Sequence, residues 1–179
     1  MLLLVVLFLA AVTIYAVSVL REPADKRPAP AACTATADGV DYRLTPGRTS
    51  TAALIAGISV RRGMPARAAS IAVATAIQES GLRNLDYGDD AGPDSRGLFQ
   101  QRPSQGWGSQ EQVMDPVYAA NAFYDALEKV PNYAELPLTV AAQTVQRSAF
   151  PDAYADHEAE AKAFASALTG HSPASLTCT

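Results

Sequence analysis

Hydrophobic residues in the middle of the chain recur every three or four positions, which is the spacing of one face of an α-helix. Leu54, Ile55 and Ile58 form the first such stripe, and they predict a helix that starts at residue 49 or 50 and ends near residue 63. Residues 40–44 alternate between apolar and polar, which predicts packed extended chain or a strand.

A second helix is predicted to begin at Pro65 and to end at Gly81, because proline suits a first helical turn and glycine suits a helix end. Its core-facing stripe is Ile71, Ala74 and Ile77. The high alanine content of this segment suits a central helix that others surround.

Glu79 lies at the end of the second helix, on a face that it shares with Ala72 and Ala76. Small residues on that face let a sugar or another segment approach the carboxyl group. Cleavage of a glycosidic bond requires an acid that keeps its proton near neutral pH, and apolar surroundings produce such an acid. Glu79 is therefore the candidate catalytic acid. A solvent-facing glutamate at a helix end is the simpler alternative.

Residues 82–95 are rich in Asp, Gly, Asn and Pro, so they predict a loop or a small irregular hairpin. Inverting glycosidases need a second carboxylate that activates water. The candidates for that role in this loop are Asp86, Asp89, Asp90 and Asp94. Ordinary solvated turn residues are the alternative for each, and the spacing lacks the pattern of a calcium-binding loop.

Residues 96–102 predict a short extended piece in which Leu98 and Phe99 anchor the core and two glutamines, Gln100 and Gln101, offer hydrogen bonds. A cleft for acetamido sugars needs neutral donors and acceptors together with an aromatic platform. Trp107, the only tryptophan, follows closely and is predicted to be either that platform or a packed anchor.

Three further helices are predicted in the second half of the chain. Asp115 caps the first, which Pro116 opens and which runs to Lys129. The others cover residues 136–147 and 151–170. The chain therefore predicts a mainly α domain with one small irregular or β-hairpin insertion after the second helix.

Two motifs in this order carry a resemblance to a known family: Glu-Ser-Gly at 79–81 and Gly-Leu-Phe-Gln at 97–100. They resemble the paired motif of the lysozyme-like superfamily, specifically lytic transglycosylases and goose-type lysozymes, over residues 65–101. Residues 100–108 also resemble a segment of actinobacterial cell-wall proteins. The resemblance implies a lysozyme-like helical fold, with Glu79 as the catalytic acid of a sugar-binding cleft. The substrate-binding residues that we expect along this cleft are Ser80, Gly97, Leu98, Phe99, Gln100, Gln101, Trp107 and Gln143.

The third motif of that superfamily, Ala-Ala-Tyr-Asn, falls at residues 141–144, where Gln143 and Thr144 replace the tyrosine and the asparagine. This departure removes a family-typical contact to the acid. The candidates to replace that contact are Gln143, Gln146, Tyr154 and Tyr133.

Residues 1–20 are apolar except for one threonine, one tyrosine and one serine, and as a helix they would be about 30 Å long. They predict a transmembrane anchor or a signal peptide. Residues 21–48 predict a Pro/Ala-rich stalk, over residues 21–32, and the entry to a lysozyme-like domain at 49–179. Basic residues directly after the apolar segment favour a domain inside the cell under the positive-inside rule, but Glu22 and Asp25 interleave with them and the cysteines favour the other side. We therefore expect a membrane-anchored or secreted protein whose domain lies on the extracytoplasmic side.

The two cysteines, Cys33 and Cys178, bracket the domain, and both lie outside the predicted helices. Because chain ends often lie close together, we expect a disulfide between them, which is typical of an oxidising compartment. Two cysteines and two histidines so placed predict no metal site, and we expect no cofactor.

The net charge of −4 provides no basic surface for a polyanion, which argues against nucleic acid as a partner. The expected partners are peptidoglycan glycan strands and, through residues 1–20, a membrane. We expect an enzyme that cleaves between N-acetylmuramic acid and N-acetylglucosamine by a lytic transglycosylase or lysozyme mechanism. The alternative is a catalytically weak peptidoglycan-binding module of a cell-wall assembly.

Overall fold

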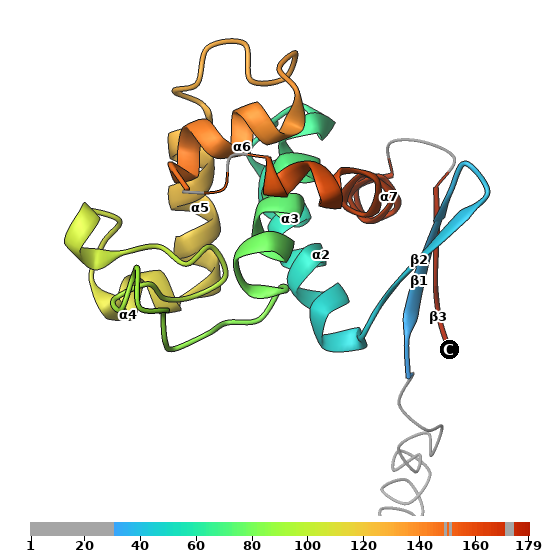
Figure 1. Ribbon diagram of the computed structural model, residues 1–179. Helices are drawn as coiled ribbons and strands as arrows, with labels where there is room; N and C mark the ends of the chain where they lie inside the picture. The colour runs from blue at the N-terminus through green and yellow to red at the C-terminus, as the bar shows by residue number, and fades with distance from the viewer. Residues whose placement is uncertain (1–30, 149, 151, 171–173) are drawn as a thin grey trace, which may run out of the picture.

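The computed structural model describes residues 31–148, 150, 152–170 and 174–179, and these residues are mainly helical, as the sequence predicts. Helix α3, Ala66–Ser80, lies in the centre of the helical part (Figure 1). The helices that pack against it are α2 (Pro46–Arg61), α5 (Pro116–Leu127), α6 (Leu138–Gln146) and α7 (Glu158–Thr169).

The central position of α3 follows from its small and apolar side chains, which are fully buried from Ile71 through Ala74 and again at Ala76. Small side chains let the neighbouring helices approach closely. The helix starts directly after Pro65 and ends where Gly81 adopts a left-handed backbone conformation, with φ 60°. The predicted bounds are confirmed to within one residue, since Pro65 is the N-cap and not the first residue of the helix.

Helices α5 and α6 lie within two residues of their predicted bounds, whereas the first and the last predicted helices differ more. Helix α2 starts at Pro46, about one turn before the predicted start, because Thr45 caps it and proline fits its first turn. The last predicted helix is divided into a 3-10 helix η2, Ala153–His157, and α7. Its predicted first residue, Pro151, lies outside the described residues.

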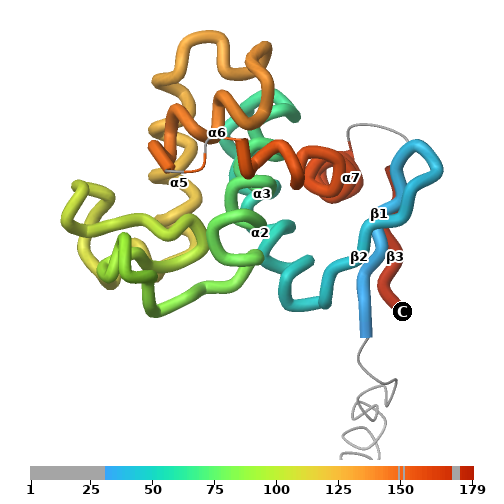
Figure 2. Tube along the Cα trace, viewed as in Figure 1, coloured from blue at the N-terminus to red at the C-terminus, as the bar shows by residue number. Residues whose placement is uncertain are grey.

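A three-stranded antiparallel sheet joins the two ends of the described chain. Its strands are β1 (Cys33–Ala37), β2 (Val40–Leu44) and β3 (Ser175–Cys178), in the order β2-β1-β3. The sheet lies beside α7, and β3 runs along β1 at the end where the described chain begins (Figure 2). Of these strands the sequence indicated only β2.

A disulfide joins Cys33 to Cys178, as predicted. The two cysteines lie directly opposite each other in the register of β1 and β3, with their Cα atoms 4.0 Å apart and 145 positions apart in the sequence. In the chain-entropy model a loop of this length is worth about 5 kcal/mol to the folded state.

The segment after α3 is irregular and contains only isolated bridges, between Leu85 and Gly97 and between Arg96 and Gln101. Residues 96–101 therefore make a tight turn, which corrects the extended piece that we expected. The segment continues into the 3-10 helix η1, Pro103–Gln105, and into a short helix α4, Gln110–Met114, which the sequence analysis did not predict.

The tight turn is held against the end of α3 by both side-chain and backbone constraints. The hydroxyl of Ser80 donates a hydrogen bond to the carbonyl oxygen of Leu98 at 2.8 Å. Gly97 has φ 77°, and a Cβ atom at this position would overlap the carbonyl oxygen of Val113. Only glycine fits here, because both the backbone conformation and the space exclude a side chain.

Residues 1–20, which we predicted to be a membrane anchor or signal peptide, lie outside the described residues, as do residues 21–30 of the predicted stalk. Among the residues that the structure describes, no helix is long and apolar enough to cross a membrane.

Phe99 is expected to contribute much more to stability than its neighbour Gln100. The ring of Phe99 is fully buried and stacks on Phe123 with the ring centroids 4.7 Å apart. Phe99→Ala should therefore lower the free energy of unfolding by ~3–5 kcal/mol, measured by thermal or urea unfolding. Gln100→Ala is the matched control, and an equal loss in that variant would contradict the assignment of Gln100 to a cleft.

Candidate active site

A cleft of ≈ 480 Å³ opens where the end of α3, the irregular segment and the end of α6 meet. Glu79 lines this cleft together with polar residues from the irregular segment and α6. Among these polar residues are Asp89, Gln100, Gln101, Arg102, Gln146 and Arg147. The cleft therefore combines one glutamate with several neutral amides.

The carboxyl group of Glu79 is partly buried and accepts a short hydrogen bond from the hydroxyl of Tyr154, with an O–O distance of 2.6 Å. Burial raises the pKa of Glu79 above its ordinary value of 4.5. The hydrogen bond from Tyr154 and the nearby amide of Gln146 lower this pKa, but burial is the largest effect. Glu79 is therefore held in place and keeps its proton at a higher pH than an exposed glutamate does.

Tyr154 is fully buried in η2, which packs against α3 and α6. Burial, together with the adjacent Glu79, raises the pKa of the tyrosine hydroxyl above its ordinary value of 10.0. The hydroxyl consequently remains protonated at neutral pH and acts as a donor to the carboxyl group.

Two of the four residues considered as replacements for the missing third motif contact the acid: Tyr154 and Gln146. Gln146 also donates a hydrogen bond of 2.8 Å to the carbonyl oxygen of Phe99, so it links the acid to the tight turn. Gln143 instead donates to the carbonyl oxygen of Ser148 at 2.8 Å and does not line the cleft. The charged groups that act on Tyr133 are Glu128 and Arg62, not Glu79.

The predicted substrate-binding residues fall into two groups. Gln100, Gln101 and Trp107 line the cleft. The others are buried behind its wall or, like Gln143, turned away from it; the buried ones are Ser80, Gly97, Leu98 and Phe99. These four position the tight turn rather than reaching the cleft themselves.

Gln101 is 1% exposed although it lines the cleft. Its amide nitrogen donates to the carbonyl oxygen of Ala119 at 3.1 Å. Its amide oxygen has no hydrogen-bond partner among the described residues. Gln101 therefore links the tight turn to α5.

The four candidate second carboxylates occupy different environments. Asp89 lines the cleft, its charge raises the pKa of Glu79, and it accepts a hydrogen bond from the backbone of Gly92 at 2.8 Å. Hydrogen bonds from Ser104, and then the ion pair with Arg102, hold the pKa of Asp94 well below its usual range. Asp94 therefore organises the loop.

The remaining two candidates, Asp86 and Asp90, are exposed and do not line the cleft. Only Asp89 of the four is thus placed near Glu79. In the part of the chain that the structure describes, no group of three or more His, Cys, Asp or Glu residues is arranged to hold a metal ion.

Exposed aromatic side chains lie on the cleft. Tyr87 is 59% exposed and Phe150 is 72% exposed, and no other aromatic side chain among the described residues is classed as exposed. Trp107 also lines the cleft while packing partly against the core. The sequence analysis missed Tyr87 and Phe150, although an aromatic residue inside a run of Asp and Gly was a usable signal for the first.

No protein-family model matches the chain, and no curated protein matches it significantly. The relation to the lysozyme-like superfamily therefore remains a resemblance carried by the two motifs.

The raised pKa of Glu79 predicts a pH-dependent gain in stability for Glu79→Gln. Because the pKa of Glu79 is higher in the folded than in the unfolded protein, the proton on Glu79 stabilises the folded state. This contribution is complete below the unfolded-state pKa, near 4.5, and is lost as the pH rises through the folded-state pKa. Glu79→Gln should therefore melt at a temperature close to that of the wild type at pH 4 and a few degrees above it at pH 8. Thermal unfolding across this range measures the difference, and a difference independent of pH would contradict the raised pKa.

Proposed function

We propose that this protein cleaves the glycan strands of peptidoglycan between N-acetylmuramic acid and N-acetylglucosamine, with Glu79 as the general acid. The observation that carries the proposal is a glutamate in an open cleft whose pKa is raised by burial and whose carboxyl group is bound by Tyr154. A general acid in glycoside cleavage needs this combination of retained proton and access to the substrate.

The other groups on the cleft suit a sugar strand. Tyr87, Trp107 and Phe150 offer aromatic faces, on which the apolar faces of sugar rings pack. The amide of Gln100, which is only partly buried, offers a neutral donor and acceptor for hydroxyl and acetamido groups. These features support a sugar ligand, and the two motifs that resemble lytic transglycosylases support the particular strand.

The chemistry follows from one acid. Glu79 gives its proton to the glycosidic oxygen of the departing N-acetylglucosamine while the bond from that oxygen to C1 of muramic acid breaks. The acetamido group of the substrate stabilises the cationic C1. The 6-hydroxyl of the same muramic acid then attacks C1 and returns its proton to Glu79, which yields a 1,6-anhydro sugar without consuming water.

The carboxylates near Glu79 favour this route over an inverting hydrolysis. An inverting enzyme needs a second carboxylate that is fixed in place to deprotonate water. Asp89 is the only one of the four candidates on the cleft, and it is exposed in a loop rich in glycine. We therefore assign to Asp89 an electrostatic effect on Glu79 and no role as a base.

A catalytically weak peptidoglycan-binding module is the second candidate, because Gln143 and Thr144 stand where the superfamily has a tyrosine and an asparagine. Tyr154 and Gln146 supply a contact to the acid from other positions, which favours the enzyme. Both candidates use the same cleft, so only turnover separates them.

The disulfide is typical of an oxidising, extracytoplasmic compartment. We propose that residues 1–20 export the domain or anchor it to a membrane, so that the cleft faces the cell wall.

Digestion of purified peptidoglycan tests the proposal. The wild-type protein should release fragments that end in 1,6-anhydromuramic acid, which mass spectrometry recognises as lighter by one water than hydrolysed fragments. Glu79→Gln should release none, because it keeps the shape of the side chain but has no proton to give. Glu160→Gln is the matched control, since burial also raises the pKa of Glu160 but this residue does not line the cleft. Cleavage by Glu79→Gln at the wild-type rate would refute the site.

Asp89→Asn tests the number of carboxylates in the same assay. The negative charge of Asp89 raises the pKa of Glu79, so its removal should lower that pKa. Activity should persist, but it should fall at a lower pH than in the wild type as Glu79 loses its proton. A complete loss at every pH, or fragments with only reducing ends, would instead assign Asp89 as the base of a hydrolase.

A further inference from the structure

A second hollow, of ≈ 680 Å³, adjoins the cleft that holds Glu79. The two share a common wall, which is formed by Gln105, Trp107, Gln146 and Arg147. The far side of the second hollow is formed mainly by α5 and the residues that follow it. We call this hollow the second lobe and the cleft that holds Glu79 the first lobe. A ligand too large for the first lobe would extend into the second.

Arg147 lies at the junction of the two lobes in an uncommon backbone conformation. It ends α6 with φ 53°, a left-handed conformation in which glycine is the favoured residue. Its side chain is exposed, and its guanidinium group has no partner among the described residues. A residue other than glycine at such a position suggests that the side chain has a use that offsets the strain.

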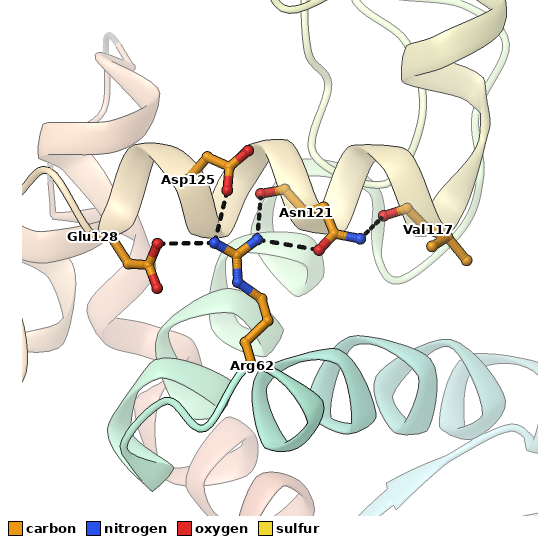
Figure 3. A network of polar contacts seen from close by, with 5 residues as sticks. All are labelled: Arg62, Val117, Asn121, Asp125 and Glu128. Atoms are coloured by element: carbon orange, nitrogen blue, oxygen red, sulfur yellow. Dashed lines mark hydrogen bonds and ion pairs between the residues drawn. The ribbon is translucent and has the colours of Figure 1, made fainter.

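The second lobe carries a local excess of positive charge. The charged side chains that line it are those of Arg147, Lys129 and Asp125. Asp125 is already paired with Arg62, at 2.7 Å, and Glu128 pairs with the same guanidinium at 2.8 Å (Figure 3). Lys129, like Arg147, has no acidic partner among the described residues. Counting Arg62 and Glu128 with the lining residues, three cations stand against two carboxylates, so this region carries a net charge of +1 in a chain whose net charge is −4.

We propose that the second lobe binds the carboxylate groups of the peptides attached to the glycan strand, through Arg147 and Lys129. This inference rests on the proposed function. Each muramic acid carries a lactyl group to which a short peptide is joined, and the free carboxylates of that peptide are the main negative charges of the strand. With the sugar rings near Trp107 and the scissile bond at Glu79, a substituent of the strand would enter the adjoining lobe, where an arginine fork matches a carboxylate.

The only tryptophan of the chain, Trp107, lies on the wall between the lobes, so its fluorescence reports on ligands in either. The test uses full-length Glu79→Gln protein, which should bind substrate without cleaving it. Two ligands are titrated: glycan oligomers that carry their peptides, and the same oligomers after an amidase has removed the peptides and left the lactyl carboxylates.

Adding Arg147→Gln to this protein should weaken binding of the peptide-bearing oligomer by about tenfold, because a charge-assisted hydrogen bond is lost. Lys129→Gln should weaken it by a smaller factor. Binding of the stripped oligomer should change little in either variant. Arg43→Gln is the control of equal charge change, since Arg43 is exposed on β2, on the side of the molecule away from the irregular segment (Figure 1).

Arg147→Gly separates recognition from structure. Glycine suits the left-handed conformation, so this variant should melt at or above the temperature of the parent protein while losing affinity as Arg147→Gln does. A clear fall in melting temperature would show that Arg147 has a structural role and would overturn the inference.

The remaining outcomes are also decisive. Equal binding of both oligomers, with no effect of Arg147→Gln, would overturn the inference and leave the proposed function standing. A larger effect on the stripped oligomer would assign the lobe to the lactyl carboxylate instead of the peptide. If the Glu79→Gln protein bound neither oligomer, the proposed function would fail together with the inference.

Discussion

The hydrogen bond between Tyr154 and Glu79 joins residues that are 75 positions apart, and the geometry of the candidate site depends on it. Burial at the end of α3 raises the pKa of the carboxyl group, which keeps the acid protonated but makes its charged form unfavourable in the folded protein. The tyrosine hydroxyl limits this penalty and fixes the orientation of the carboxyl group. The site thus balances two opposing effects on one pKa, and burial is the larger.

The packing of the helices brings Glu79, Tyr154 and the tight turn together. The small side chains of α3 let its neighbours pack closely around it, and η2 then brings Tyr154 to the end of that helix. Ser80 and Gln146 both bind carbonyl oxygens of the tight turn, those of Leu98 and Phe99. Hydrogen bonds therefore connect the tight turn, the end of α3 that carries Glu79, and α6, although these segments come from distant parts of the chain.

The sequence predicted the features that depend on neighbouring residues, such as the ends of α3, or on the number of residues of one type. The bounds of α3 follow from Pro65 and Gly81, and the burial of Phe99 follows from an apolar pair in a polar segment. The pairing of Cys33 with Cys178 was also predictable, because the sequence contains no other cysteine. These features needed only neighbouring residues or simple counting.

Non-local features were missed or left open. Strand β3 is defined by its pairing with β1 at the opposite end of the chain, and no local pattern marked it. Four residues were equally eligible to contact Glu79, and the packing of η2 and α6 against α3 selected Tyr154 and Gln146. The exposure of Phe150 on the cleft was likewise invisible, since an isolated phenylalanine in the sequence is more commonly buried.

The central claim is that Glu79 meets the glycosidic bond of a strand bound in the cleft. A crystal structure of Glu79→Gln with a bound peptidoglycan glycan oligomer would test it most directly. The account predicts sugar rings against Trp107 or Phe150 and a glycosidic oxygen about 3 Å from the side-chain amide of residue 79. An oligomer bound outside the cleft, or one bound in it with every glycosidic oxygen beyond hydrogen-bonding reach of that side chain, would contradict the account.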